Sequence, residues 1–331
     1  MSTLLQQKTY TTFEGEKPLR RLPGLCLELL SEQNKTWLDL RKGYESLTNV
    51  RERDVPCRGF SVRLQYNPGR IKSSLADGGE KNLNEKRCFL CLDHLPEGQI
   101  GILYRSEYLI LCNPIPVFPY HFTISHIDHR PQAIAEQIGT LSQLMADMGS
   151  GWTVFYNGPK CGASAPDHLH FQVTPSGRMP IEKEIREEKR LTLMIQVASV
   201  FFYRVGNLGR EAILLEGDDP IAVGSVFNGF LNELKKAILI DEEPMMNIAG
   251  FHEERKWRFV IFPRRKHRPD AFFREGDGRM VVSPGVIDMG GVLITPVEKD
   301  FERLDGAVVE SIFEEVSLEG KTVERAIDAL K

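Results

Sequence analysis

The segment Asp167-His-Leu-His-Phe-Gln172 constrains the fold more than any other, because its polar and apolar residues alternate strictly. Successive side chains of a β-strand point to opposite faces, so the alternation predicts a strand over 168–174. His168, His170 and Gln172 then share one face, and the residues between them point to the core. Imidazole and carboxamide groups need hydrogen-bond partners when buried, so three on one strand face are costly without a function. The pattern therefore predicts a site on the face of a β-sheet.

Length, charge and cysteine content limit the kind of protein. The 331 residues allow one large domain or two ordinary ones, and 41% hydrophobic residues are enough for a sizeable core. The 42 basic and 46 acidic side chains give a net charge of −4, which is too balanced for a general DNA-coating or membrane-surface protein. We find neither a signal-peptide core nor an apolar run of the roughly 18–20 residues that cross a bilayer. We expect a soluble, cytoplasmic protein whose six cysteines are reduced or bind metal.

The second half of the chain echoes the first. A shift of 90 residues places Asn157 on Asn247 and 168–172 on 258–262, and an amphipathic helix precedes each copy. Val260 and Phe262 then stand where the first copy has polar site residues. We expect an α+β fold of two halves, each an antiparallel sheet flanked by helices, with chemistry only in the first half. The division is an N-terminal helical segment (1–57), a catalytic half (58–180) and a degenerate half with a C-terminal strand and helix (181–331).

Local signals place three further elements. Apolar residues at helical spacing predict a helix over 25–47, after the breaker Pro23-Gly24. Pro131 is suited to the first turn of a helix that continues to Met148. Near the end of the chain, 292–295 is predicted as a strand and 298–313 as a helix.

Cys88-Phe-Leu-Cys91 is an ambiguous motif on its own. A redox pair is expected at a helix start in a thioredoxin-like unit, which the neighbouring sequence does not show, and two buried free thiols are a second interpretation. Zinc is the third, and it needs about four ligands. The candidates for the remaining ligands are His94, His121, His126, His129 and His168.

Two loops and one basic stretch are candidates for binding anions. Small residues in the loop from Asn157 to Ser164 let backbone N–H groups approach an anion, and Lys160 adds a charge, although such loops are often plain turns. Asn67-Pro-Gly-Arg70-Ile-Lys72 offers two cations beside a turn. The eight Arg and Lys residues of 255–274 form either a solvated face or a surface for a phosphate-rich substrate. No motif for reading a nucleic-acid groove accompanies them.

The motif His168-x-His170-x-Gln172, together with Asn157 and the Cys pair, resembles the histidine-triad (HIT) superfamily in its transferase branch. That branch includes galactose-1-phosphate uridylyltransferases, diadenosine tetraphosphate phosphorylases and GDP-hexose (GDP-L-galactose) phosphorylases, and the last are the most similar. The resemblance covers about residues 58–305. It rests further on the segments Gln65-Tyr-Asn-Pro-Gly-Arg70, Leu111-Cys-Asn113-Pro and Gly290-Gly-Val-Leu-Ile-Thr-Pro-Val-Glu-Lys-Asp300-Phe. Leu169 stands where the uridylyltransferases have Pro, which argues against hexose-1-phosphate exchange. Two HIT-like halves are implied.

The resemblance also implies roles for individual residues. His170 matches the nucleophile that attacks the α-phosphorus of a nucleotide, and Gln172 matches the residue that hydrogen-bonds the phosphoryl oxygens. The residues that match contacts to sugar or phosphate are Asn67, Arg70, Lys72, Asn157, Lys160 and Ser164. The residues that match a structural zinc site in the zinc-bearing relatives are Cys88, Cys91, His129 and His168.

The residue types suit transfer of a nucleotidyl group. A neutral imidazole can attack an anionic phosphate, and the hydrogen bond at one ring nitrogen fixes the tautomer of the other. A carboxamide at Gln172 cannot exchange protons near neutrality, so an acceptor that arrives ionised is favoured over water. We expect a nucleotidylyltransferase of phosphorylase type that acts on a nucleotide-sugar or dinucleotide, with phosphate or a sugar phosphate as acceptor. A HIT-type hydrolase that releases a nucleoside monophosphate and a non-enzymatic nucleotide-binding protein are the alternatives. A homodimer is compatible with this interpretation; nucleic acid and membranes are not expected partners.

Overall fold

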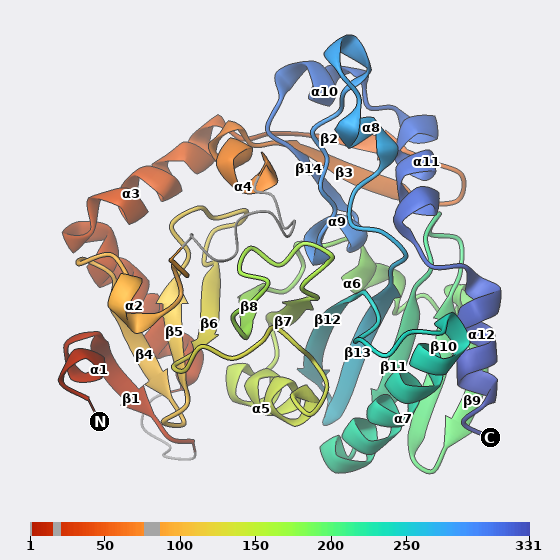
Figure 1. Ribbon diagram of the computed structural model, residues 1–331, viewed down its shortest axis with the longest axis horizontal. Coiled ribbons are helices and arrows are strands. Elements are labelled where there is room, and N and C mark those ends of the chain that lie inside the picture. The colour runs from red at the N-terminus through yellow and green to blue at the C-terminus, as the bar shows by residue number, and fades with distance from the viewer. Residues whose placement is uncertain (1, 16–20, 76–86) are drawn as a thin grey trace.

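One long, twisted sheet runs through the molecule (Figure 1). The computed structural model describes residues 2–15, 21–75 and 87–331, without the side chains of Lys72 and Ser73. Neighbouring strands are antiparallel except for the first pair, which is parallel. In spatial order the eleven strands are β1 (Thr9–Phe13), β4 (Gly101–Tyr104), β5 (Tyr108–Cys112), β6 (Phe122–His126), β8 (His170–Pro175), β7 (Trp152–Asn157), β12 (Met246–Glu253), β13 (Lys256–Pro263), β11 (Ile213–Gly217), β10 (Val200–Val205) and β9 (Leu191–Val197).

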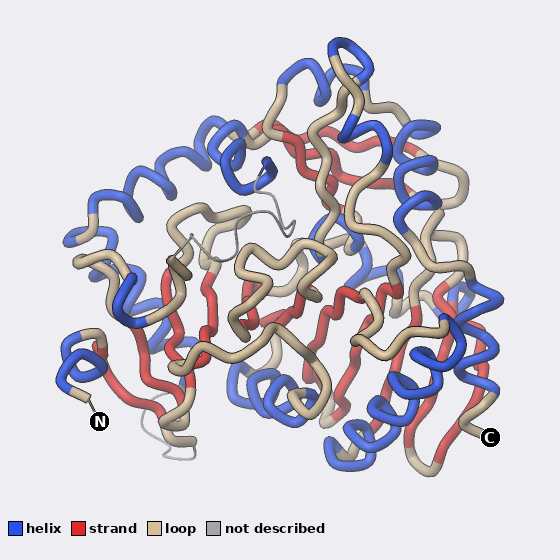
Figure 2. The backbone as a smooth tube through the Cα atoms, viewed as in Figure 1, coloured by secondary structure: helices blue, strands red, loops and turns tan. Residues whose placement is uncertain are grey.

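The sheet consists of two similar halves that meet where β7 pairs with β12. Apart from the edge strand β1, and counted inward toward the junction, one half has the order β4-β5-β6-β8-β7 and the other β9-β10-β11-β13-β12. Each half carries one long helix just before its strand at the junction, α5 (Ile138–Met148) before β7 and α7 (Pro220–Ile238) before β12. Asn157 and Asn247, which the 90-residue shift superposes, face each other across the junction. The expected fold of two halves is confirmed, and Figure 2 shows their strands as one continuous row.

Helices cover one face of this sheet. Alternate strand residues such as Ile124, Phe171 and Ile248 are fully buried there, in one apolar cluster with residues of α2, α5, α7 and α12. Burial of each such side chain contributes about 1.5–3 kcal/mol, so the alternation within the strands determines which face the helices cover. Of these four helices, α2 spans Leu22–Thr36 and α12 spans Gly320–Asp328.

The opposite face carries two apolar clusters with a polar strip between them. A second sheet of β14 (Val292–Thr295), β3 (Ser61–Tyr66) and β2 (Arg51–Pro56) packs on the second half through residues such as Val62, Val260 and Phe262. Leu103, Leu109 and Leu111 of the first half pack on the segment that carries the Cys pair. Between the clusters the strands present polar residues on this face, namely Thr123, Ser125, Asn157, His170, Gln172 and Asn247. The candidate site lies in this strip.

Shorter helices complete the structure. In Figure 1 the small sheet with α10 and α11 lies on the side of the molecule opposite α5 and α7. No helix in the described residues combines the length and the apolar character that a membrane span requires. The remaining α-helices are α1 (Thr3–Gln7), α3 (Leu38–Glu45), α4 (Ile71–Leu75), α6 (Ile181–Glu184), α8 (Asp270–Phe273), α9 (Val286–Met289), α10 (Glu298–Arg303) and α11 (Gly306–Val316).

Tertiary contacts change several element boundaries from those predicted. The helix expected from Pro131 begins only at Ile138. The backbone N–H groups of Ile134 and Ala135 donate to the carboxylate of Glu243 instead. Backbone groups in the predicted first turns are therefore held by a side chain far along the sequence.

The two predicted terminal helices are each divided. The helix over 25–47 is split at Trp37 into α2 and α3, and Pro23 lies in the first turn of α2 rather than before it. The helix over 298–313 is split into α10 and α11, because Asp305 caps the start of the second. The boundaries at 57 and 180 stay a proposal.

Candidate active site and metal centre

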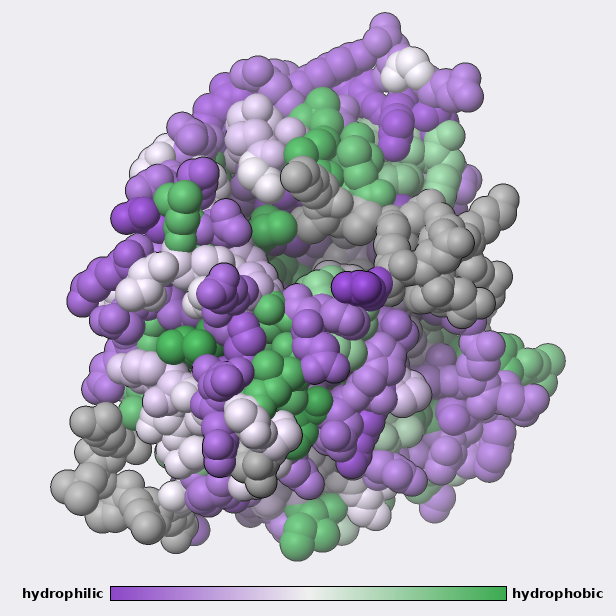
Figure 3. Space-filling view, turned by 60° about the vertical axis from the view of Figure 1, so that its left-hand side comes forward, coloured by the Kyte–Doolittle hydropathy of each residue, from purple (hydrophilic) through white to green (hydrophobic). Residues whose placement is uncertain are grey.

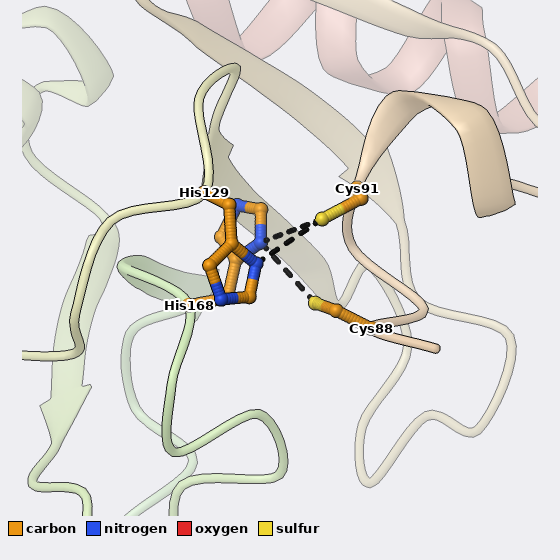
Figure 4. Close-up of side chains that lie close together, drawn as sticks. All are labelled: Cys88, Cys91, His129 and His168. Atoms are coloured by element: carbon orange, nitrogen blue, oxygen red, sulfur yellow. Dashed lines mark hydrogen bonds between the residues drawn. The ribbon is translucent and has the colours of Figure 1, made fainter. Parts of the chain in front are cut away.

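Two cysteines and two histidines form a compact cluster beside the sheet. The ligand atoms of Cys88, Cys91, His129 and His168 all lie within 4.8 Å of one another. Cys88 Sγ is 3.2 Å from His168 Nδ1, and Cys91 Sγ is 3.2 Å from His129 Nδ1 and 3.7 Å from His168 Nδ1 (Figure 4). Tetrahedral zinc with bonds of about 2.0–2.3 Å requires ligand atoms about 3.3–3.8 Å apart. The donor types and their number therefore fit zinc, and the three distances just given are close to the required spacing.

The second ring nitrogen of each histidine has a partner that orients the ring. His168 Nε2 donates to the backbone carbonyl of His126 at 2.8 Å, which leaves Nδ1 with its lone pair toward the cysteines. His129 Nε2 lies 3.5 Å from a carboxylate oxygen of Asp167. Carbonyl and carboxylate partners of this kind are typical of metal-binding histidines. His94 instead contacts the backbone carbonyl of Cys88.

The N-terminal segment supports the loop that carries the Cys pair. Lys8 is only 9% exposed, and its ammonium group donates to the backbone carbonyls of Leu95, Pro96 and Glu97. Gln33 of α2 donates to the carbonyl of Gly98. Sequence patterns did not predict this support, because a single Lys or Gln gives no signal of its partner.

One imidazole nitrogen of His170 is left without a partner by the residues that the structure describes. The ring is 2% exposed, and Nδ1 lies 2.8 Å from the backbone carbonyl of His168. A carbonyl only accepts, so Nδ1 carries the hydrogen and Nε2 keeps its lone pair. Nε2 is buried and has no hydrogen-bond partner among the described residues. Burial lowers the pKa of His170 to about 4, so the ring is neutral near pH 7. A buried polar atom left unpaired in this way indicates a place for a ligand.

The side chain of Gln132 lies between β7 and β8, at the point where β8 begins with His170. Its Nε2 donates to the backbone carbonyls of Asn157 and His170, and its Oε1 accepts from the backbone N–H of His170. The side chain is 2% exposed and so takes the place of direct strand pairing at this point. Gln132 was not predicted as a site residue, since its only role in the sequence pattern was as part of a helix that does not form there.

His121 orients the carboxamide of Gln172. The backbone N–H of Val117 donates to His121 Nδ1 at 3.2 Å, so the hydrogen of the neutral ring is on Nε2. That nitrogen lies 2.7 Å from Gln172 Oε1, and the amide nitrogen of Gln172 therefore points the other way as a donor. Burial, with the charge of Arg70 nearby, lowers the pKa of His121 to about 3.

The predicted strand face holds for two of its three polar residues. His170 and Gln172 lie on one face of β8, while the adjacent Phe171 points into the helical core. The strand begins at His170, so His168 lies just before it and turns toward the cysteines.

The loop after β7 brings Asn157 to the same strip. Asn157 Oδ1 accepts hydrogen bonds from the amide group of Asn247 at 2.7 Å and from the backbone N–H of Val286 at 2.8 Å. Gly162 adopts a φ of +107°, and a Cβ there would lie 2.9 Å from Gly285 Cα. A residue with a side chain at 162 is therefore both strained and crowded.

The remaining predicted contact residues divide into near and distant positions. Arg70 donates to the backbone carbonyl of Ile115, and its charge acts on His121, so it lies close to the strip. Asn67 is 1% exposed and donates to Gln65. Lys160 is exposed and paired with Glu242, and Ser164 is exposed. The side chain of Lys72 lies outside the described residues. Their contacts with substrate stay predictions.

The basic stretch 255–274 does not form one continuous cationic face. Lys256 and Arg258 both pair with Glu216, and Lys266 pairs with Asp270 and Glu315. Arg264 is 2% exposed and contacts Asn247 inside the molecule. The interpretation as a solvated face thus fits part of this stretch, whereas Arg264 belongs to the interior.

Exposed apolar side chains adjoin the polar residues of the site. Ile71 follows Arg70, Ile115 supplies the carbonyl that Arg70 contacts, and Tyr120 precedes His121; these apolar side chains are 38%, 37% and 44% exposed. Figure 3 shows a hollow near the middle of the molecule, with hydrophobic as well as hydrophilic residues at its rim. Apolar walls with a few convergent polar groups are typical of small-molecule sites.

Comparison with known proteins identifies the fold. Residues 29–175 match a family model described as "Domain of unknown function (DUF4922)". No curated protein matches the chain. Among solved structures it is similar to the yeast Ap4A phosphorylase Apa2, free (15% identity, TM-score 0.54), with AMP (15%, 0.52) and with Ap4A (17%, 0.54). The similarity covers 88% of this chain and 96–97% of the yeast chains.

At this level of identity the likeness concerns the fold. A GDP-hexose phosphorylase is not among these neighbours, so the finer resemblance to that group stays a prediction. The two-halved sheet flanked by helices agrees with the expected architecture. The chain therefore has the fold that the yeast Ap4A phosphorylase Apa2 also adopts.

Proposed function

We propose that the chain is a nucleotidylyltransferase that works as a phosphorylase, with a dinucleotide or a nucleotide-sugar as donor. The observation that carries this proposal is the buried Nε2 of His170, which has no hydrogen-bond partner in the described part of the chain. Its lone pair is set by the hydrogen bond from Nδ1 to the His168 carbonyl. The yeast neighbours are structures of an Ap4A phosphorylase, with AMP or Ap4A bound in two of them, which favours a dinucleotide.

The reaction divides into two transfers at phosphorus. In the first, His170 Nε2 forms a bond to the α-phosphorus while the bond from that phosphorus to the bridging oxygen breaks, and the leaving phosphate chain keeps the electron pair. In the second, an oxygen of phosphate or of a sugar phosphate attacks the same phosphorus, and the N–P bond returns its electrons to the imidazole. The hydrogen bond from Nδ1 to the His168 carbonyl stabilises the charge that the ring carries between the two steps.

Amide donors would stabilise the charge that develops during the transfer. Charge develops on the non-bridging phosphoryl oxygens, and fixed N–H donors stabilise it. The Gln172 amide nitrogen is oriented outward because His121 holds its oxygen, and Asn157 supplies a second amide. Neither side chain can take a proton from water near pH 7. An acceptor that is already anionic needs no such base, which favours phosphorolysis over hydrolysis.

The Cys and His cluster would hold a structural zinc ion. Cys88, Cys91, His129 and His168 offer four protein ligands, so no coordination position would remain open for water or substrate. When bound, the ion would tie the loop at 88–91 to the residue two positions before His170. Its contribution would be to aim the nucleophile.

The test compares nucleotide donors with and without orthophosphate. The expected result with Ap4A or a GDP-hexose is a nucleoside diphosphate that forms only when phosphate is present, and an acid-labile, base-stable adduct when it is absent. His170→Ala is expected to lose at least about 10³-fold in turnover while it stays folded. His252→Ala, in β12 of the second half, is the matched histidine control and keeps its activity.

Other outcomes would reject the proposal in distinct ways. A nucleoside monophosphate formed at the same rate with or without phosphate would indicate a hydrolase. Binding of AMP without turnover of any donor would indicate a nucleotide-binding protein. Turnover that survives in His170→Ala would remove the covalent step.

A further inference from the structure

The amide group of Asn157 is held from the second half of the chain. Asn157 Oδ1 accepts from the Val286 backbone N–H, which is always a donor, so this atom is the oxygen and the nitrogen lies on the other side. Asn247 Nδ2 donates to the same oxygen at 2.7 Å. Within the described residues Asn157 Nδ2 makes no hydrogen bond, and the side chain is 7% exposed. The Nδ2 group of Asn157 therefore points in a fixed direction, because two N–H groups hold the oxygen at the other side of the amide.

Arg264 in turn orients Asn247. A guanidinium has only donors, and Arg264 donates to Asn247 Oδ1 at 2.5 Å, so the nitrogen of Asn247 must face Asn157 and the carbonyl of Cys161. Arg264 is itself fixed by the backbone carbonyls of Val316, Pro284 and His267. The chain of contacts thus runs from a fully buried cation through one amide to the next.

Asn157 lies next to His170 on the neighbouring strand of the sheet. Phe155 pairs with Gln172, and continuing this antiparallel register by two residues places Asn157 opposite His170 on the same face. The side chain of Gln132 bridges the backbone carbonyls of the two residues.

We infer that Asn247 and Arg264 are positioning residues that direct the Asn157 amide donor toward the phosphoryl group bound at His170. This inference rests on the proposed function. The second half, which lacks the nucleophile, then has a defined task in the reaction: its copy of the same asparagine aims the active copy across the junction of the halves.

A double-mutant cycle on the whole chain tests the inference. The variants are Asn157→Ala, Asn247→Ala and both together, with Ap4A and phosphate as substrates. Removal of a fixed donor to a developing oxyanion costs about 10²–10³-fold in kcat, so we expect about 10²-fold for Asn157→Ala and about 10-fold or more for Asn247→Ala, with KM nearly unchanged. The double variant is expected to match Asn157→Ala within about threefold, because Asn247 acts through Asn157. Losses that multiply would overturn the inference.

Two variants separate positioning from general damage. Asn247→Asp keeps the volume and the contact with Arg264, but places a carboxylate oxygen against Asn157 Oδ1, so we expect a greater loss of kcat than for Asn247→Ala in a protein that still folds. Asn232→Ala, an exposed asparagine on α7 of the same half, is expected to match the wild type. Equal activity of Asn247→Asp and wild type would also overturn the inference.

A measurement without substrate distinguishes failure of this inference from failure of the proposed function. In ligand-free protein with ¹⁵N-labelled asparagine, the side-chain amide signal of Asn157 is identified by its absence in Asn157→Ala. We expect the order parameter of this amide, measured by ¹⁵N relaxation, to fall from about 0.85 to below about 0.6 in Asn247→Ala, because one of the two donors that hold its oxygen is gone. An unchanged order parameter would reject the positioning role even in a protein that turns over no dinucleotide.

Discussion

Burial determines the protonation state of His121, and a hydrogen bond determines its tautomer. Burial and the nearby charge of Arg70 lower its pKa to about 3, so the ring is neutral near pH 7. Nδ1 accepts from the N–H of Val117, so the single ring hydrogen lies on Nε2. The same ring fixes Gln172. One residue thus links the orientation of a site amide to the pH dependence of stability.

The stability of the protein is therefore expected to fall in mild acid. The unfolded chain binds a proton at His121 below about pH 6.5, whereas the folded chain does so only near pH 3, so the contribution of His121 is fully present at pH 7 and is progressively lost as the pH falls. Between pH 7 and 5 this loss amounts to about 2 kcal/mol in the free energy of unfolding. Urea unfolding at both pH values measures it.

The control for this prediction is His121→Asn. Other buried histidines contribute equally to both proteins, so the difference between the two pH dependences isolates His121. The variant is less stable at pH 7 but is expected to lose about 2 kcal/mol less on acidification. An identical pH dependence in the two proteins would contradict the assignment.

At the scale of elements, the loop at 88–91 and the start of β8 form one unit. Cys88 and Cys91 contact His168, which is followed after one residue by His170, the proposed nucleophile. Lys8 and Gln33 hold the other end of the loop. A structural ion here would stabilise the loop and the strand end together, although it takes no part in the chemistry.

Cys88→Ser is expected to lose the metal and loosen this unit. Elemental analysis of the wild type should give about one zinc per chain, and of the variant close to none. We expect the melting temperature to fall by about 10 °C and turnover to fall about tenfold or more. Cys57→Ser, a thiol outside the cluster, is the matched control. Wild type that purifies without metal yet melts as high with a chelator as with zinc would contradict this prediction.

At the scale of the whole molecule, strand periodicity and repeat spacing predicted the architecture. The alternation around His170 located the site face, and the pairing of Asn157 with Asn247 agrees with the 90-residue shift. Contacts between segments far apart in the sequence were not predictable in this way. Gln132, Asn247 and Arg264 act through partners 17 to 90 residues away, and no local pattern records such a partner. For the same reason β1, which pairs with β4, was missed.

The halves are expected to depend on each other for folding. Expressed alone, residues 1–180 would leave β7 as a long open edge and deprive β3 of its partner β14. We expect this fragment to show no cooperative thermal transition by near-ultraviolet circular dichroism, and co-expression with residues 181–331 to restore one. A sharp transition in the isolated fragment would show that the first half is an independent domain.

Joining the halves in one polypeptide has a genetic consequence. In a symmetric homodimer of a single half, one codon would specify both asparagines at the junction, so a mutation of the supporting copy would also change the proposed donor. Here Asn157 and Asn247 are encoded separately and can diverge. Natural selection can therefore act on support and chemistry at different codons, and homologous genes with a changed second asparagine should also carry changes around the buried arginine beside it.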